Sequence, residues 1–329
     1  MKYTVGTVKE LWRYPVKSMA GELVNEAQIE KLGMVGDRCW AVRDEDKNET
    51  TSVKKLPKLL LCSPEYEQQP EKGQVGDEVP HVNIILPDGT SFRSEDENKN
   101  EILSAYLKKN VSLWPLQSKK NWKFYQLKTM AGAEAMKKQF NSKEELPNLA
   151  SVSWLKLLEL SIFATPLGRF YDAYPLHLVT SNSIEKLKQL TPEGDFIPQR
   201  FRPNIYIESS IKNANLDEFE WVGGKLHIGN TIIKCNSRTV RCSMPAQPQP
   251  NINKDSKILR TLEKYTKRHL GINGSVIQVG SIRCGDTVYW EPEAKYALRK
   301  FYQPVSDGIR NRVIQSSLKM VDRLGSRNS

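Results

Sequence analysis

The chain has 329 residues, 39% of them hydrophobic, and its 49 Lys and Arg against 38 Asp and Glu give a formal net charge of +11. This length and apolar fraction allow one large or two smaller packed domains and exclude a disordered chain. The positive charge predicts an anionic partner, such as a phosphate-bearing cofactor, a nucleic acid, an acidic protein or a membrane surface. A lysine excess is about as often a solvated surface.

The cysteines are odd in number, widely spaced and form no C-x-x-C pair: Cys39, Cys62, Cys235, Cys242 and Cys284. This pattern excludes a disulfide framework and a zinc ribbon, and it fits a reducing compartment. The N-terminus runs directly into strand-like sequence, and no apolar stretch reaches the roughly 20 residues that span a bilayer. We therefore expect a cytoplasmic protein.

The first region, residues 1–115, shows short strand-like runs separated by turn signals. The run His81–Leu86 leads into Pro87-Asp88-Gly89, which predicts a hairpin. Asn98–Lys109 has the apolar spacing of a short helix. The pattern indicates a β-rich N-terminal domain.

A second β-rich region, residues 166–291, follows a basic connector at 116–165, whose lysines indicate a solvated surface rather than a nucleic-acid site. Helices are predicted at Ser181–Leu190, capped by Ser181 or Ser183, and at Asp255–Leu270. Many short strands with few helices predict a closed or nearly closed barrel, and the fold class is mainly β with α, an α+β protein.

The tail, residues 292–329, has a helical pattern and is basic, with apolar residues on one face: Ile309, Val313, Met320 and Leu324. Such a stripe usually packs on its own domain. A peripheral contact with a membrane or a partner is the alternative.

Several enzyme signatures are missing from the sequence. It contains no Walker A motif, G-x-G-x-x-G, H-E-x-x-H or G-x-S-x-G, and its four histidines are isolated. Nucleotide kinases, dinucleotide dehydrogenases, zinc hydrolases and serine hydrolases of these types are therefore excluded.

Cys242 is the residue around which a site is most plainly indicated. It follows Arg241 after the apolar run Thr231–Lys234, and prolines at 245, 248 and 250 end regular structure beyond it. A neighbouring cation favours the thiolate, which binds metals and attacks electrophiles. The alternative is a small buried hydrophobic residue, the common role of a free cysteine.

Three basic clusters lie elsewhere in the chain. Lys17 and Ser18 follow a proline turn, Arg38 precedes an apolar strand, and Arg202 stands at a strand entrance. Arginines at such places suit bidentate contact with phosphate oxygens, although each could form a salt bridge with a neighbour such as Asp37.

Taken in order, these motifs resemble the MOSC family of molybdenum-cofactor proteins, which includes the mitochondrial amidoxime reducing component and its bacterial relatives. The residues that carry the resemblance are YPVKSM at 14–19, GDRCW at 36–40, RPN at 202–204 and RC at 241–242. The resemblance implies an N-terminal MOSC β-barrel domain, a C-terminal MOSC barrel with peripheral helices, and a molybdenum–molybdopterin cofactor.

The resemblance also implies residue roles. Cys242 would be the molybdenum ligand and a catalytic residue, Asp172 a catalytic polar group near the metal, and the cofactor would be bound by Lys17, Ser18, Arg38, Arg202 and Arg241. The implied activity is reduction of N-hydroxylated compounds. No iron–sulfur cysteines follow the barrel, so a separate redox protein would supply the electrons.

Two alternatives remain. The protein could carry the cofactor or transfer sulfur through Cys242, or it could be a basic interaction module. The family's membrane anchor is missing from the start of this sequence. The segment Ser243–Pro250 also differs from the Thr- and Asp-containing run of the amidoxime reducer, which leaves the substrate open.

Overall fold

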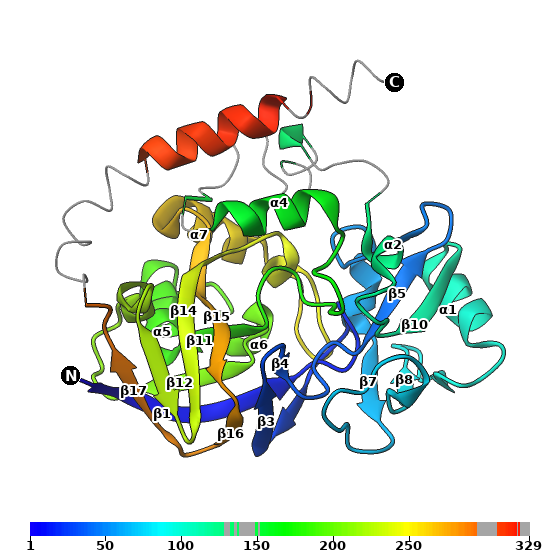
Figure 1. Cartoon of the computed structure of the whole chain (residues 1–329), viewed down its shortest axis with the longest axis horizontal. Coiled ribbons are helices and arrows are strands. Elements are labelled where there is room, and N and C mark those ends of the chain that lie inside the picture. The colour runs from blue at the N-terminus through cyan, green and yellow to red at the C-terminus, as the bar shows by residue number, and fades with distance from the viewer. Residues whose placement is uncertain are drawn as a thin grey trace.

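The computed structural model describes residues 1–127, 132–134, 137, 149–150, 152–294, 308–320 and 322. The remaining parts of the predicted connector and of the predicted tail, Leu324 included, lie outside these described residues. The predicted α+β class is confirmed (Figure 1).

A closed seven-stranded β-barrel forms the larger body. Its strands follow the order β12-β11-β15-β14-β13-β17-β1, and pairing of β12 with β1 closes the ring. The bounds are β1 (Tyr3–Arg13), β11 (Leu176–Thr180), β12 (Ile205–Ser209), β13 (Lys225–Ile228), β14 (Thr231–Val240), β15 (His269–Gln278) and β17 (Thr287–Glu291). The predicted barrel is therefore confirmed.

Strand β1 comes from the N-terminal region, yet it closes the barrel that the C-terminal strands build. A bulge between Val8 and Glu10 shifts its alternation, so that Val8 and Leu11 both enter the apolar interior. At the seam, a Cβ on Gly6 would lie 2.3 Å from the carbonyl oxygen of Glu208. A glycine is therefore required where β1 approaches β12. The domain boundaries expected from the sequence stay a prediction.

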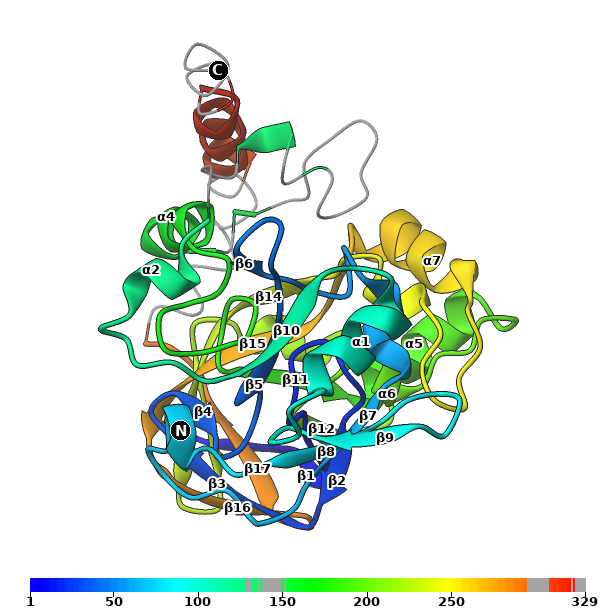
Figure 2. The same cartoon turned by 90° about the vertical axis from the view of Figure 1, so that its right-hand side faces the viewer.

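The smaller body contains two short sheets, ordered β10-β5-β6 and β7-β8-β9 (Figure 2). A third short sheet, β16-β3-β4, packs on the barrel, because its buried residues Ala27, Ile29, Met34 and Ile282 belong to the barrel core, and β2 (Glu22–Val24) extends β1. Their bounds are β3 (Glu26–Glu30), β4 (Gly33–Met34), β5 (Trp40–Asp44), β6 (Glu49–Thr50), β7 (Ser63–Tyr66), β8 (Val82–Ile85), β9 (Ser91–Arg93), β10 (Val111–Pro115) and β16 (Gly280–Arg283). The expected hairpin is confirmed as β8 and β9, and the expected helix as α1 (Lys99–Leu107).

Helices α5 (Ser181–Leu190), α6 (Pro198–Phe201) and α7 (Ser256–Thr266) cover one side of the barrel around a second apolar cluster. The cap of α5 is neither predicted serine: the Thr180 hydroxyl accepts from Ser183 N at 3.2 Å. Helix α7 ends at Thr266 rather than Leu270. Lys267 and Arg268 take left-handed φ values of 51° and 65°, and strand β15 follows at once.

The tail is helical at residues 308–320 and lies above α4 (Trp154–Ile162), with the short α2 (Trp122–Tyr125) on the far side of α4 (Figure 2). The predicted packing stripe was wrong. Ile314 and Leu318 pack against Leu157 of α4, whereas the predicted residues are exposed: Ile309 (61%), Val313 (49%) and Met320 (64%). Of the helices within the described ranges, none combines the length and apolar character needed to cross a bilayer.

Candidate cofactor site

Cys242 lies where β14 ends, two residues before the short turn Met244–Ala246 begins with Pro245 in its first turn. Its side chain is buried, and the preceding residue is anchored because Arg241 N donates to Arg268 O at 2.7 Å. The thiol is thus held on a fixed segment at one end of the barrel.

Arg241 extends into the protein and contacts a histidine on strand β11. Its Nη1 lies 3.2 Å from His177 Nε2, and its Nη2 donates to Phe201 O at 2.8 Å. His177 Nδ1 in turn lies 3.4 Å from Arg202 O. Burial, and then the positive charge of Arg241, lower the pKa of His177 to about 3, so the imidazole is neutral.

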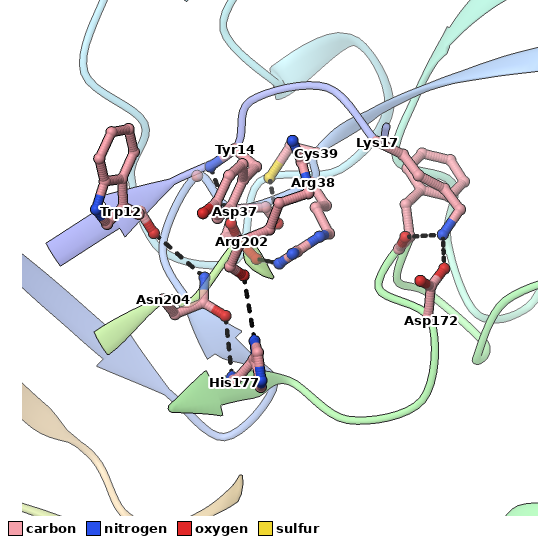
Figure 3. A network of polar contacts seen from close by, with 12 residues as sticks. Trp12, Tyr14, Lys17, Asp37, Arg38, Cys39, Asp172, His177, Arg202 and Asn204 are labelled. Atoms are coloured by element: carbon pink, nitrogen blue, oxygen red, sulfur yellow. Dashed lines mark hydrogen bonds and ion pairs between the residues drawn. The ribbon is translucent and has the colours of Figure 1, made fainter. Parts of the chain in front are cut away.

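Two predicted arginines flank the ring of Tyr14 (Figure 3). The guanidinium carbon of Arg202 lies 4.0 Å from the ring centroid and that of Arg38 lies 4.8 Å from it. Arg38 also forms an ion pair with Asp37, whose other oxygen accepts from Tyr14 N at 3.0 Å. The local salt bridge that the sequence allowed is therefore made by Arg38. The Arg202 side chain donates through Nη1 to Met19 O.

Lys17 and Ser18 approach the same region from the turn after β1. Lys17 Nζ donates to Phe170 O at 2.9 Å and forms an ion pair with Asp172. The Ser18 hydroxyl oxygen accepts from Val53 N at 3.1 Å, which leaves its proton to donate elsewhere. The site therefore presents a buried ammonium and a hydroxyl donor side by side in the sequence.

Asp172 differs from the other predicted residues because it faces solvent. Its side chain is 63% exposed, against 5% for Lys17. Partial desolvation raises the pKa of the Asp172 carboxyl, but nearby cations, chiefly Lys17, hold it well below its usual range. Asp172 is therefore ionised at neutral pH, at the open side of the site.

The backbone is strained at three of the predicted residues. Ser18, Arg38 and Arg202 have φ values of 70°, 53° and 51°, in the left-handed region that residues with side chains rarely adopt. Each such conformation costs about 1–2 kcal/mol and persists only where surrounding contacts enforce it. Strain of this kind is characteristic of ligand-binding segments.

The cluster carries more positive than negative charge, which favours binding of an anion. Its four cations, Lys17, Arg38, Arg202 and Arg241, face two carboxylates, Asp37 and Asp172. Arg202 Nη2 and Arg241 Nε are buried without a hydrogen-bond partner. Burial lowers the pKa of Arg202 from 12.5 to about 10. Buried donors of this kind are rare, and an acceptor within the site would satisfy them.

The donor set also limits how a metal could bind. Within the part of the chain that the structure describes, no three His, Cys, Asp or Glu side chains gather as a metal site. A metal here would take one thiolate from Cys242 and its other ligands from a cofactor. A molybdenum centre whose pterin supplies sulfur ligands, and whose phosphate meets the arginines, fits these residues.

Three residues of the cluster, His177, Tyr14 and Asn204, were not predicted as parts of the site. Asn204 Oδ1 accepts from His177 N at 3.1 Å and Asn204 Nδ2 donates to Trp12 O at 3.3 Å (Figure 3). Tyr14 and Asn204 stand within motifs already singled out, which was an available signal. His177 gave no signal, because the arginine it contacts is 64 residues away.

Comparison with protein families places the chain in a class. Residues 5–110 match the MOSC N-terminal beta barrel domain, and residues 168–289 match the MOSC domain. The chain therefore belongs to the proteins that combine these two domains.

Among curated relatives, it is similar to human mitochondrial amidoxime reducing component 2, with 28% identity over 87% of this chain and 83% of that protein. The rat protein of the same name is 25% identical over the same shares. A solved structure, the YUAD protein from Bacillus subtilis, covers 89% of this chain and 98% of its own at 10% identity, with a TM-score of 0.41.

Proposed function

We propose that this protein is a molybdenum-cofactor-dependent oxidoreductase that reduces N-hydroxylated compounds with electrons from a separate redox protein. The relatives are named for amidoxime reduction, and the MOSC domain is consistent with association of a molybdenum cofactor. The observation that carries the proposal is the pair of buried, unpartnered guanidinium nitrogens of Arg202 and Arg241, the second of which interacts electrostatically with the neighbouring Cys242.

In this proposal each predicted residue has a role in holding the cofactor. The Cys242 thiolate is the protein's ligand to molybdenum, and Arg202 and Arg241 donate to the cofactor's anionic groups through their unpartnered nitrogens. Lys17, Ser18 and Arg38 supply the remaining contacts with the cofactor. When bound, the cofactor supplies the two-electron redox chemistry of molybdenum.

The overall conversion breaks the N–O bond of an amidoxime, consumes two electrons and two protons, and releases an amidine and water. Asp172 and Lys17 are placed to handle those protons. The Asp172 carboxylate is exposed to solvent and ionised, while Lys17 Nζ holds a proton inside the site and contacts that carboxylate. In this role Lys17, whose pKa is lowered by burial, donates a proton within the site, and the Asp172 carboxylate orients the ammonium.

The electron donor would dock on the surface that surrounds Asp172. The outward stripe of the helix at 308–320 offers a second contact surface, for a partner or a membrane. A cytoplasmic location remains part of the proposal.

The test is turnover by protein purified from a host that makes the cofactor, with an aromatic amidoxime as substrate and reduced methyl viologen as electron source. Wild type and Cys284→Ala, which removes an exposed thiol away from the site, are expected to form the amidine. Cys242→Ala is expected to form none. Turnover by that variant at the wild-type rate would refute the assignment.

The same preparations examine the alternative. Full cofactor loading with no reduction of any N-hydroxylated compound would replace the oxidoreductase by a cofactor carrier. A persulfide on Cys242, detected by mass spectrometry in metal-free protein, would replace it by sulfur transfer.

A further inference from the structure

We propose that His177 is a positioning residue that fixes the orientation of the two cofactor-facing arginines, Arg202 and Arg241, relative to each other. The inference rests on the proposed function, because the ligand that these arginines would meet is the molybdenum cofactor. His177 belongs to β11, and its imidazole is hydrogen-bonded to Arg202 O, Leu270 O and Arg241.

Hydrogen-bond chemistry indicates the tautomer of His177. The Nε2 atom lies 3.2 Å from Arg241 Nη1 and 3.4 Å from Leu270 O. A guanidinium can only donate, and the shorter, charge-assisted contact with Arg241 makes Nε2 an acceptor. The proton then resides on Nδ1, which lies 3.4 Å from the carbonyl oxygen of Arg202 and donates to it. One neutral imidazole thus joins the side chain of one arginine to the backbone of the other.

The backbone of His177 and the space around its ring are both fixed by neighbouring residues. His177 N donates to Asn204 Oδ1 at 3.1 Å, and Asn204 N donates back to His177 O at 2.8 Å. Below the ring, a Cβ on Gly271 would lie 2.5 Å from His177 Nε2, and Gly271 adopts a φ of +74° that favours glycine. The absence of a side chain at Gly271 therefore leaves the space that the imidazole occupies.

This arrangement determines which arginine nitrogens remain for a ligand. Arg241 uses Nη1 on His177 and Nη2 on Phe201 O, so only its buried Nε has no partner. Arg202 uses Nη1 on Met19 O, and its Nη2 has none. The contact with Nε2 fixes the guanidinium plane of Arg241. The contact with Nδ1 fixes the strained backbone of Arg202, whose φ is 51°.

Two substitutions separate the two contacts. In His177→Gln the amide oxygen reaches the place of Nε2 and can accept from Arg241. His177→Asn keeps a donor near the place of Nδ1 but cannot reach Arg241. His227→Asn, on strand β13 and bonded to Glu291, is the matched control.

The measurement is molybdenum and oxidised pterin per mole of protein, with the melting temperature of the cofactor-free form beside it. We expect His177→Asn to lose at least about tenfold in cofactor content, the range typical when a partner of a ligand-binding residue is removed. His177→Gln should stay within about threefold of wild type by the same scale. The two cofactor-free variants should melt within a few degrees of each other.

The outcomes distinguish the positioning role of His177 from the proposed function. Loading of both the Asn and the Gln variant at the wild-type level would overturn the positioning role and leave the proposed function intact. Loss in Asn and recovery in Gln would support it even if no amidoxime were reduced. A wild type that binds no cofactor in a competent host would reject both proposals.

Discussion

Replacing Arg202 by Met should stabilise the cofactor-free protein and weaken cofactor binding, so that one substitution has opposite effects in the two states. The reason is that Arg202 is 4% exposed and keeps an unpartnered Nη2. In the absence of an anion, the fold bears the cost of burying this charge. In its presence, the same nitrogen donates to the ligand.

The magnitude follows from the environment of Arg202. Burial lowers its pKa from 12.5 to about 10, which corresponds to about 3 kcal/mol against the charged form. Met at this position also loses the bond to Met19 O and the contact with the Tyr14 ring, each of about 1 kcal/mol. We expect a net gain of about 1 kcal/mol in the free energy of unfolding of the cofactor-free form.

Cofactor binding should respond in the other direction. Loss of one charge-assisted hydrogen bond to the ligand is worth about 2 kcal/mol, or roughly a thirtyfold weaker affinity. Urea unfolding of cofactor-free protein, from a host unable to make the cofactor, measures the first effect. Cofactor content after purification from a competent host measures the second.

Arg200 provides the matched control. It is fully buried two residues away, but each of its nitrogens has a partner: Nε on Asp195 O, Nη1 on Pro245 O, and Nη2 on Asp195 Oδ2 and Asn253 O. Arg200→Met should destabilise the cofactor-free protein by about 3–5 kcal/mol, because the carbonyl oxygens of Asp195, Pro245 and Asn253 all lose their donor. If Arg202→Met also destabilised it by 2 kcal/mol or more and still loaded cofactor fully, the reasoning would be refuted.

Three further predictions concern single residues. Asp172→Asn should leave the Lys17 ammonium without its carboxylate. The lowered pKa of Asp172 means that its contribution to stability is present above pH 4 and lost below, so the variant's stability should depend less on pH there. Glu218→Gln should be more stable than wild type at pH 8, with the difference vanishing below pH 4.5, because burial raises the pKa of Glu218 and its ionisation opposes folding. Gly6→Ala should cost about 3 kcal/mol, because its Cβ would lie 2.3 Å from Glu208 O at the barrel seam.

All three are measured by urea unfolding, and the Asp172→Asn and Glu218→Gln variants are measured as a function of pH. A Glu218→Gln variant that is less stable at pH 8, or an Asp172→Asn curve parallel to wild type below pH 4, would contradict the electrostatic account. For Gly6→Ala the control is Gly308→Ala, where a Cβ meets no heavy atom within 4 Å. Equal stability of the two variants would contradict closure of the barrel at β1.

Local sequence patterns predicted the elements whose determinants are themselves local. The turn after Leu86 predicted the hairpin of β8 and β9. The apolar run Thr231–Lys234 belongs to strand β14, which ends two residues before Cys242. The pattern did not give the end of α7, because the left-handed residues Lys267 and Arg268 carry no glycine to mark it. Nor did it give the cap of α5, since Thr180 also reads as the last residue of a strand.

Features that depend on contacts between residues distant in the chain could not be predicted from local sequence patterns. The helix at 308–320 has apolar residues on two faces, and only packing against Leu157 selects Ile314 and Leu318. Strand β1 gave no indication that it would pair with β12, some 200 residues away. For the candidate site, the residue types came from motifs. The unpartnered nitrogens of the buried Arg202 and Arg241 are visible only in the folded structure.

The most direct test of the central claim is molybdenum and pterin analysis of Cys242→Ala beside wild type and Cys284→Ala, all expressed where the cofactor is made. The account predicts close to one molybdenum and one pterin per chain for wild type and Cys284→Ala, and loss of the metal in Cys242→Ala. Wild-type protein that is folded yet contains neither metal nor pterin would contradict it.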